Sequence, residues 1–195
     1  MKLIISVLLL MTFSTYAQNY GLINRAEALL KAEKPNFKKV EKLLKRAKKR
    51  DYGFCGNARM TALCEIDFLE AKMLFLKSEY VACLSLIDSD DTWIVNKSGD
   101  SLKILTLIKI HGKETIKKLI EKDAERMITR TSGYQYKDIC INLDTINYTF
   151  CFRDQEDAFD YKKEVTIAEI LQKTNFYHLL YDPKPNTKQL KTQIP

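Results

Sequence analysis

Histidine and cysteine are the residues in this chain that most often bind metals or act as nucleophiles; it has two histidines and five cysteines. Neither His111 nor His178 lies in a metal-ligand motif, such as two histidines at helical spacing with a glutamate. The sequence also lacks a nucleophile elbow, a phosphate-binding glycine loop and a dinucleotide fingerprint. We therefore expect no catalytic residue, no metal and no cofactor. A small hydrolase with an unrecognised site stays open, because scattered Asp and Glu pairs leave no sequence pattern.

The cysteines predict one disulfide. Two runs of aromatic and β-favouring residues, 139–143 and 146–152, are typical of a β-hairpin. A four-residue connection, 144–147, places Cys140 directly opposite Cys151, at a cross-strand separation that suits a disulfide. The alternative is a pair of reduced cysteines on one face of the hairpin.

Three cysteines remain. In the register of a 43-residue repeat, Cys83 lies near Ala71, and Cys64 lies about two helical turns from Ala71 along the same helix. The resulting separation of roughly 10 Å argues against a bond between Cys64 and Cys83. Cys55, in a loop between two glycines, either pairs with Cys64 or stays reduced. One cysteine is left over in a monomer, and Cys55 or Cys83 is the candidate.

Basic residues are concentrated in one segment. Residues 20–50 contain eleven Lys and Arg against three Glu, whereas the rest of the chain after Lys2 carries 20 basic and 22 acidic residues. Within this segment, residues 37–50 predict an amphipathic helix with one apolar face: Phe37, Val40, Leu43, Leu44 and Ala47. The side directly opposite is basic, with four lysines: Lys38, Lys42, Lys45 and Lys49. Four further cations flank them: Lys39, Arg46, Lys48 and Arg50.

This stripe is the candidate partner-binding site, with these residues: Lys38, Lys42, Lys45, Lys49 and Arg46. It has the charge of a surface for an acidic protein, an anionic glycan or a membrane surface. Nucleic acid is disfavoured, since no aromatic residue is interleaved with the stripe to stack on bases. The alternative is a solvated outer helix face that only aids solubility.

The N-terminus predicts export. A basic start at Lys2 precedes an apolar run over 3–11, and 15–17 offers a small-x-small cleavage site. Residues 1–17 are therefore interpreted as a signal peptide, with a buried N-terminal helix as the alternative. The apolar run is too short to span a bilayer. Periplasm, cell surface and medium all stay open as destinations.

The remaining patterns define the fold class. Helices are predicted at 22–34, 37–50, 57–76, 76–88, 102–110 and 115–128. The segment 102–110 also fits a strand, because its apolar residues nearly alternate. A capping box at Thr166 opens a last helix to about Tyr181. The predicted domains are a helical region, a β-hairpin plus capped helix that packs on the helical region, and a flexible tail: 18–130, 131–182 and 183–195.

Two helical pairs repeat at a spacing of 43 residues. Phe37 aligns with Tyr80 and Val40 with Cys83, and a small residue precedes each aromatic residue by nine positions. This pattern resembles the tetratricopeptide family, whose period is about 34 residues. The resemblance covers 22–47 and 64–87, and implies stacked antiparallel helices with a concave binding surface. An irregular helical bundle is the alternative.

The sequence thus predicts a mainly α protein, in which antiparallel helical hairpins are followed by a β-hairpin and a C-terminal helix. Its expected function is that of an exported, non-enzymatic protein-binding module: an adaptor, an inhibitor or an immunity-type partner of another extracytoplasmic protein. The alternatives are a binder of anionic envelope lipid or glycan through residues 37–50, and the small hydrolase named above.

Overall fold

The computed structural model describes residues 20–53, 56–88, 97–123, 127–131, 137–154 and 167–182. Several predictions lie outside them: the signal peptide at 1–17, the tail at 183–195, Cys55 and Thr166. The chain divides into two compact units, 1–94 and 95–195. The sequence pattern predicts the main domain boundary near residue 130, whereas the structure groups the helices at 97–123 with the sheet that follows them.

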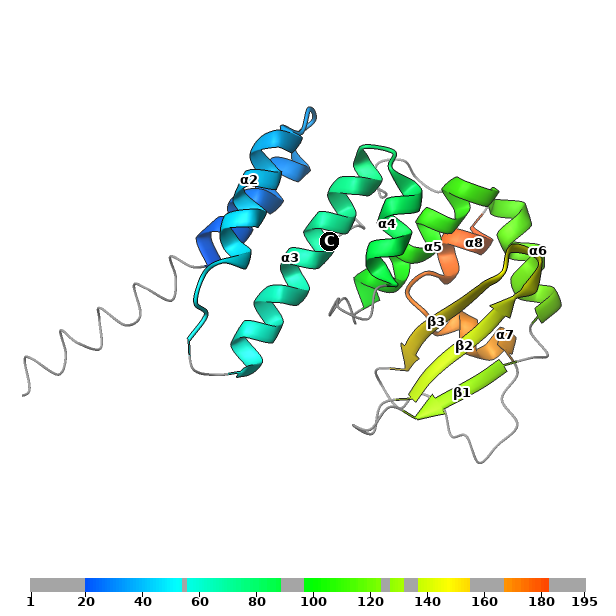
Figure 1. Ribbon diagram of the computed structural model, residues 1–195. Coiled ribbons are helices and arrows are strands. Elements are labelled where there is room, and N and C mark those ends of the chain that lie inside the picture. The colour runs from blue at the N-terminus through cyan, green and yellow to red at the C-terminus, as the bar shows by residue number, and fades with distance from the viewer. Residues whose placement is uncertain are drawn as a thin grey trace, which may run out of the picture. The chain divides into compact units, whose positions relative to one another are not determined.

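Helices build the described part of the first unit. They are one over residues 20–31, α2 (Phe37–Lys48), α3 (Gly56–Leu76) and α4 (Tyr80–Ile87). Helix α3 lies between α2 and α4 and contacts both (Figure 1). This position explains why α3 is apolar on nearly all sides, because a helix with neighbours on two faces has little solvated surface. Its buried residues are Ala62, Ile66, Asp67, Phe68, Leu69, Ala71, Lys72, Met73 and Phe75.

Local chemistry fixes both ends of α2. At its start, the Asn36 side chain accepts a hydrogen bond from the backbone N–H of Lys39 at 3.0 Å, which caps the first turn. At its end, the Tyr52 hydroxyl donates to the Ala47 carbonyl oxygen at 3.0 Å and satisfies a last-turn acceptor. Tyr52 is buried and meets the Tyr20 ring edge-on at 5.5 Å. These contacts hold α2 in one orientation.

The 43-residue spacing found in the sequence falls on equivalent positions of α2 and α4. Each helix begins with an aromatic residue, and Val40 and Cys83 are both completely buried. The preceding helices correspond less well, since Ala28 is exposed whereas Ala71 is buried. The second helices of the two pairs therefore share a register, and the tetratricopeptide resemblance stays a prediction.

The second unit combines helices with a sheet. Its described elements are α5 (Lys97–His111), α6 (Lys113–Asp123), β1 (Met127–Thr131), β2 (Lys137–Leu143), η1 (Asp144–Ile146), β3 (Tyr148–Asp154), α7 (Ile167–Gln172) and α8 (Tyr177–Tyr181). The antiparallel sheet has the order β1-β2-β3; α6 contacts β2, and α8 contacts α5 and α6. The mainly helical fold with a β-hairpin and a C-terminal helix is thereby confirmed.

One face of the hairpin builds the core of this unit. Ile139 pairs with Phe152 and Ile141 with Phe150, and all four side chains are buried. Phe176, just before α8, meets both phenylalanine rings edge-on at 5.3 Å. The chain that follows the sheet is thus held to it by aromatic contacts.

The helix predicted to reach residue 128 is wrong at its end. Helix α6 stops at Asp123, and residues 127–131 form β1. Strand β1 pairs with β2 from Met127 opposite Ile141 onward, so it covers an edge that β2 would otherwise expose. Pairing with a distant strand has overridden the local helical periodicity.

The single C-terminal helix predicted up to Tyr181 is also wrong, because it consists of α7 and α8. Thr174 lies between them, and its hydroxyl and backbone N–H both donate to the Leu171 carbonyl, at 2.7 and 3.0 Å. A threonine that bonds back to the preceding turn offers the backbone an alternative to continued helix.

Candidate functional site

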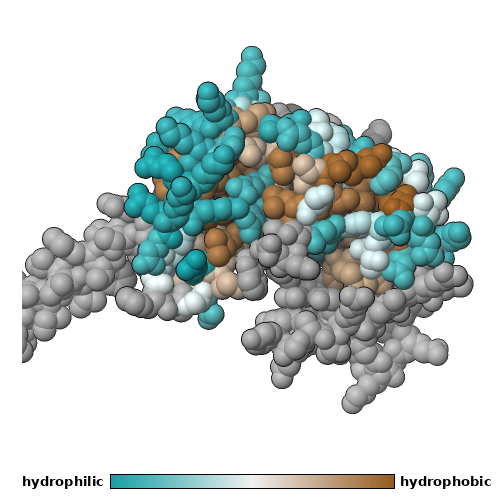
Figure 2. Space-filling model, in the orientation of Figure 1, coloured by the Kyte–Doolittle hydropathy of each residue, from teal (hydrophilic) through white to brown (hydrophobic). Residues whose placement is uncertain are grey.

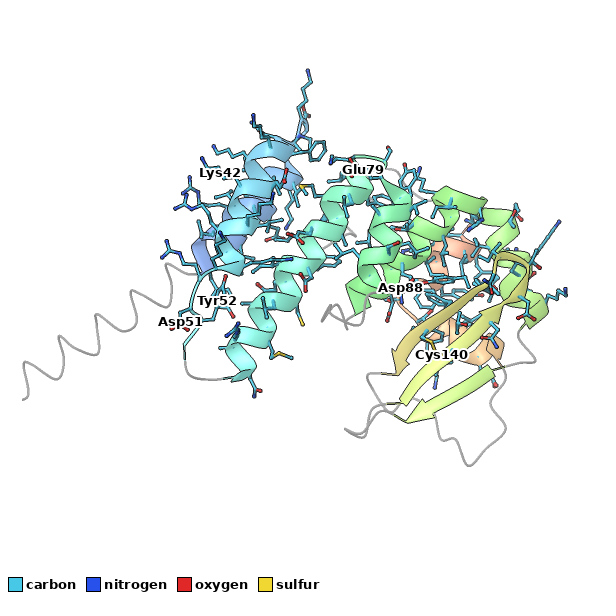
Figure 3. All side chains as sticks on the ribbon, in the orientation of Figure 1. Lys42, Asp51, Tyr52, Glu79, Asp88 and Cys140 are labelled. Atoms are coloured by element: carbon cyan, nitrogen blue, oxygen red, sulfur yellow. A yellow bond between two sulfur atoms is a disulfide. The ribbon has the colours of Figure 1, made fainter. Side chains whose placement is uncertain are left out.

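Helix α2 separates apolar from basic residues as the sequence predicted. Its apolar side is buried in the first unit through Val40, Leu43, Leu44 and Ala47. Figure 2 shows hydrophilic side chains gathered over this helix. The Lys42 side chain extends away from α3 (Figure 3).

Two of the cations on α2 are already paired. Lys45 lies 2.8 Å from the Glu41 carboxylate, in an exposed ion pair between residues four apart. Lys48 lies 3.0 Å from Asp67 Oδ1 and 2.7 Å from Glu70 Oε2, both on α3. Lys45, predicted as a site residue, therefore has its charge offset within α2 itself.

The other cations of residues 37–50 form no ion pair within the described ranges, and all of them are exposed: Lys38, Lys39, Lys42, Arg46, Lys49 and Arg50. These six residues are named the basic face below. It includes all the predicted site residues except Lys45. Lys39 and Arg50, predicted only as flanking residues, belong to it as well.

Part of the charge order on α2 reduces its stability, although the cations of its last turn suit the helix dipole. Lys38, Lys42 and Arg46 follow one another at four-residue spacing, and such like-charged pairs each cost about 0.2–0.5 kcal/mol in isolated helices. The first turn contains no acidic residue, although the positive end of the helix dipole favours one. Lys38 and Lys39 thus occupy positions where stability favours Asp or Glu.

Solvation alone does not require these lysines. The positions on α4 that lie 43 residues after Lys38, Lys39 and Lys42 carry no charge, and all are exposed: Val81, Ala82 and Ser85. Helix α4 has no charged residue along its length. The first unit therefore exposes two outer helices of very different chemistry.

Lys48 turns inward and ties α2 to α3. Burial lowers the pKa of Lys48, but its hydrogen bonds to Glu70 and Asp67 outweigh that effect, so its pKa lies above the ordinary lysine value. Asp67 is itself buried. The bridge fixes the rotation of α2 and thereby the direction of the basic face. Sequence reasoning missed it, although an aspartate between the apolar residues Ile66 and Phe68 signals a charge that needs a partner.

Lys72 is a second charge inside the first unit, and only 4% of its surface is exposed. The pKa of Lys72 is lowered to about 8, mainly by burial and also by the Lys31 charge, while Glu27 acts in the opposite direction. Lys31 and Glu27 form an ion pair at 2.6 Å on the helix over 20–31. Lys72 is buried and does not belong to the basic face.

The predicted disulfide is confirmed. Cys140 and Cys151 are opposite each other in the β2–β3 register and are bonded, with their Cα atoms 4.1 Å apart (Figure 3). Leu143 lies opposite Tyr148, as the predicted four-residue connection requires.

Two other cysteines in the described ranges carry thiols. Cys83 is completely buried on α4, which fits a packing role. Burial raises the pKa of the Cys64 thiol, and the charges of Asp67 and Glu65 act in the same direction. A raised thiol pKa reduces the thiolate fraction, so Cys64 has little nucleophilic character near neutral pH.

Other chemistry is sparse among the residues that the structure describes. No group of His, Cys, Asp and Glu in those ranges has the arrangement to hold a metal ion. His111 ends α5 and His178 lies in α8, and both are partly exposed. None of the described helices combines the length and the apolar character needed to cross a bilayer. No protein-family model matches the chain, and no significant match was found among curated proteins or solved structures.

Proposed function

We propose that the protein is an exported, non-enzymatic protein-binding module whose basic face binds an acidic extracytoplasmic protein. One observation supports this most directly. Six exposed cations gather on one short segment and form no ion pair within the described ranges, and those near its start occupy positions that reduce the stability of α2. A local arrangement that works against the fold is expected where function requires it.

An acidic partner supplies what the basic face lacks. Its carboxylates would offset the repulsion among Lys38, Lys42 and Arg46 and form charge-assisted hydrogen bonds with them. Before contact, the field of the basic face would attract the partner and raise the association rate, an effect that salt weakens. Binding is therefore expected to be fast and strongly dependent on ionic strength.

A protein partner fits α2 better than a lipid surface does. Membrane-binding helices insert an apolar side between the headgroups while their cations contact anionic lipid. The apolar residues of α2 are instead in the core, apart from the half-buried Phe37. An anionic lipid or glycan as ligand remains the alternative that the experiment below separates.

Export and repeat architecture are part of the proposal. The pattern of residues 1–17 supports a signal peptide. The bond between Cys140 and Cys151 suits an oxidising compartment, where disulfides persist. The shared burial of Val40 and Cys83 supports the tetratricopeptide-like reading of the two helical pairs.

The first experiment measures binding of the purified protein to three anionic probes. These are fluorescein-labelled poly-L-glutamate of about 20 residues, a heparin oligosaccharide, and phosphatidylglycerol–phosphatidylcholine vesicles, in about 50–200 mM NaCl. We expect saturable binding of the polypeptide that weakens with salt and exceeds partition to vesicles or heparin at equal anion concentration. Tighter binding to vesicles or heparin would instead support the envelope-ligand alternative, and binding to none of the probes would refute the proposal.

A second experiment identifies the partner in the source cells. A photo-crosslinking amino acid replaces Lys42, and in a control it replaces Lys118, which is exposed on α6. We expect one crosslinked protein with an acidic surface at position 42, absent from the control and lost when Lys38 is changed to Glu. Equal crosslinking from both positions would count against the basic face.

A further inference from the structure

The two halves of the basic face differ in their surroundings. The C-terminal half lies near two carboxylates of α3, Asp67 and Glu70, which pair with Lys48, while Glu41 from the first half of α2 reaches Lys45. The charge of Glu70 also acts on Lys45, where it helps to raise the lysine pKa. These carboxylates offset part of the positive field around Arg46, Lys49 and Arg50.

The N-terminal half has less compensation in the described residues, because Glu41 is the acidic residue within it and its carboxylate is bonded to Lys45. Lys38, Lys39 and Lys42 form no ion pair there. The nearby Glu41 is hydrogen-bonded to Lys45, which lowers the Glu41 pKa. Because Coulomb attraction falls with distance and is screened by salt, a partner gains most where the cations are closest to it and least offset.

Apolar surface lies at the N-terminal end of α2, beside these cations. Phe37 opens α2, and Leu29 lies near the end of the helix over 20–31; both side chains are partly buried against the core of the first unit. The fixed aromatic ring beside Lys38 combines an apolar contact with cations. Protein interfaces place their strongest contacts at aromatic side chains that are held in place and surrounded by polar groups.

We propose that the N-terminal half of the basic face, with Phe37, Lys38, Lys39 and Lys42, is the anchor of the docking surface. The partner surface that fits it presents carboxylates around an apolar side chain. This inference rests on the proposed function and deepens it, because it states where the partner binds most strongly and which chemistry it carries.

Paired charge reversals test the position of the anchor. Lys38→Glu with Lys42→Glu alters the N-terminal half, and Arg46→Glu with Lys49→Glu makes the same charge change in the C-terminal half. With the poly-L-glutamate probe at low salt, we expect affinity to fall about tenfold or more for the first pair and about threefold for the second. The first pair also adds acid near the helix start, which favours folding, and thermal melts of both variants verify that they are folded.

The outcomes separate the two proposals. A loss from the C-terminal pair that equals or exceeds the N-terminal loss overturns the anchor and leaves the proposed function intact. Unchanged binding in both variants overturns the anchor and the proposed function together.

A pair of peptides tests the apolar part. Both are about 12 residues long with equal numbers of Glu, but one has two central Leu residues where the other has Ser; burial of each Leu is favourable. We expect the wild-type protein to bind the Leu peptide several-fold more tightly, and Phe37→Ala to abolish that difference while binding of the Ser peptide persists. Equal binding of the two peptides by the wild-type protein would overturn the apolar contact.

Discussion

Helices α2 and α6 are both short, lysine-rich and amphipathic, and both have cations in the last turn, yet their first turns differ in charge. Helix α6 has Glu114 in its first turn and Lys122 in its last, as the helix dipole favours. Its Glu114 and Lys118 are four residues apart, as are Lys117 and Glu121, so opposite charges are neighbours. Helix α2 has no acid in its first turn, and Lys38, Lys42 and Arg46 follow one another at that spacing. Helix α6 also has cations four residues apart, at Lys118 and Lys122, but two of its lysines have a glutamate at the same spacing.

The difference shows that two lysine-rich helices of similar length can be balanced by acidic neighbours to different degrees, and the proposed binding surface lies on the less balanced one. Both helices bury an apolar side, which α6 does through Ile116, Leu119 and Ile120. On α6 the acid of the first turn and two Glu–Lys pairs offset much of the positive charge, although Lys118 and Lys122 also lie four residues apart. On α2 less of the positive charge is offset, and the proposed acidic partner would explain why the unfavourable positions are tolerated.

The largest expected effect tests whether the two units act separately. Replacing the disulfide by Cys140→Ala and Cys151→Ala, at a sequence separation of 11, should destabilise the second unit by about 3 kcal/mol through loop entropy. Binding of poly-L-glutamate should not change, because the basic face lies in the first unit. Urea unfolding and the binding titration measure the two effects, and a parallel loss of binding would contradict the comparison.

The second prediction concerns the buried charge of the first unit. Lys72 has its folded-state pKa lowered to about 8, so its burial penalty is fully present below that pH. Between about pH 8 and 10.5 the unfolded chain binds more protons than the folded one, and stability should rise with pH. Lys72→Met should stabilise the protein at pH 7 by about 2–3 kcal/mol, at about 1.4 kcal/mol per pKa unit.

Urea unfolding at pH 7 and pH 9.5 checks this prediction, with the exposed Lys118→Met on α6 as the control. The stabilisation by Lys72→Met should shrink at the higher pH. A constant or growing stabilisation would show that Lys72 is not penalised by burial.

The third prediction concerns the ion pairs that fix the rotation of α2 about its axis. Lys48→Met leaves Asp67 buried without its cation, and we expect a loss of roughly 1–2 kcal/mol, below that of a fully buried pair because Lys48 is partly exposed. Poly-L-glutamate binding should also weaken as α2 loses its fixed rotation. Chemical denaturation against Lys118→Met measures the loss, and identical stabilities would show that the bridge contributes nothing.

The position of α2 and the disulfide could both be predicted from the sequence, since apolar periodicity located α2 and the cross-strand register located Cys140 and Cys151. The ion pairs of α2 could not be predicted in this way. Lys45 and Lys49 lie on the same side of a helical wheel, and only the contact with Glu41 separates them. The inward turn of Lys48 depends on α3, a partner outside its own helix.

Contacts with distant segments also decided the structure of the sheet, and local sequence patterns do not reveal them. The first two residues of β1, 127 and 128, continue an amphipathic pattern and were predicted as the end of a helix, because periodicity within a segment contains no information about its pairing with β2. The break at Thr174 was missed for a related reason, since a side chain that bonds its own backbone leaves the apolar pattern intact.

The fourth prediction gives α2 the charge order of α6. Lys38→Glu puts an acid in the first turn and opposite charges at four-residue spacing with Lys42, which should stabilise the protein by about 0.3–1 kcal/mol. The same change should weaken binding, so stability and binding move in opposite directions. Thermal melts and titrations on one sample test this, and a variant that loses both would indicate a structural role for Lys38.

The smallest expected effect follows from the loss of an ion pair on α2. Glu41→Gln releases Lys45 from its exposed partner, and poly-L-glutamate affinity should rise by about twofold, since exposed pairs are weak. Glu114→Gln on α6 makes the same change of net charge and should leave affinity unaltered. A fall in affinity after Glu41→Gln would mean that Glu41 itself assists binding.

The most direct test of the central claim compares matched charge reversals on the two helices. Lys38→Glu with Lys42→Glu on α2, and Lys118→Glu with Lys122→Glu on α6, change exposed lysines at the same four-residue spacing and alter net charge equally. Titration with poly-L-glutamate at low salt should show at least about tenfold weaker binding for the α2 variant and wild-type binding for the α6 variant. Equal weakening of both would mean that the probe responds to net charge alone, and would contradict a binding surface on α2.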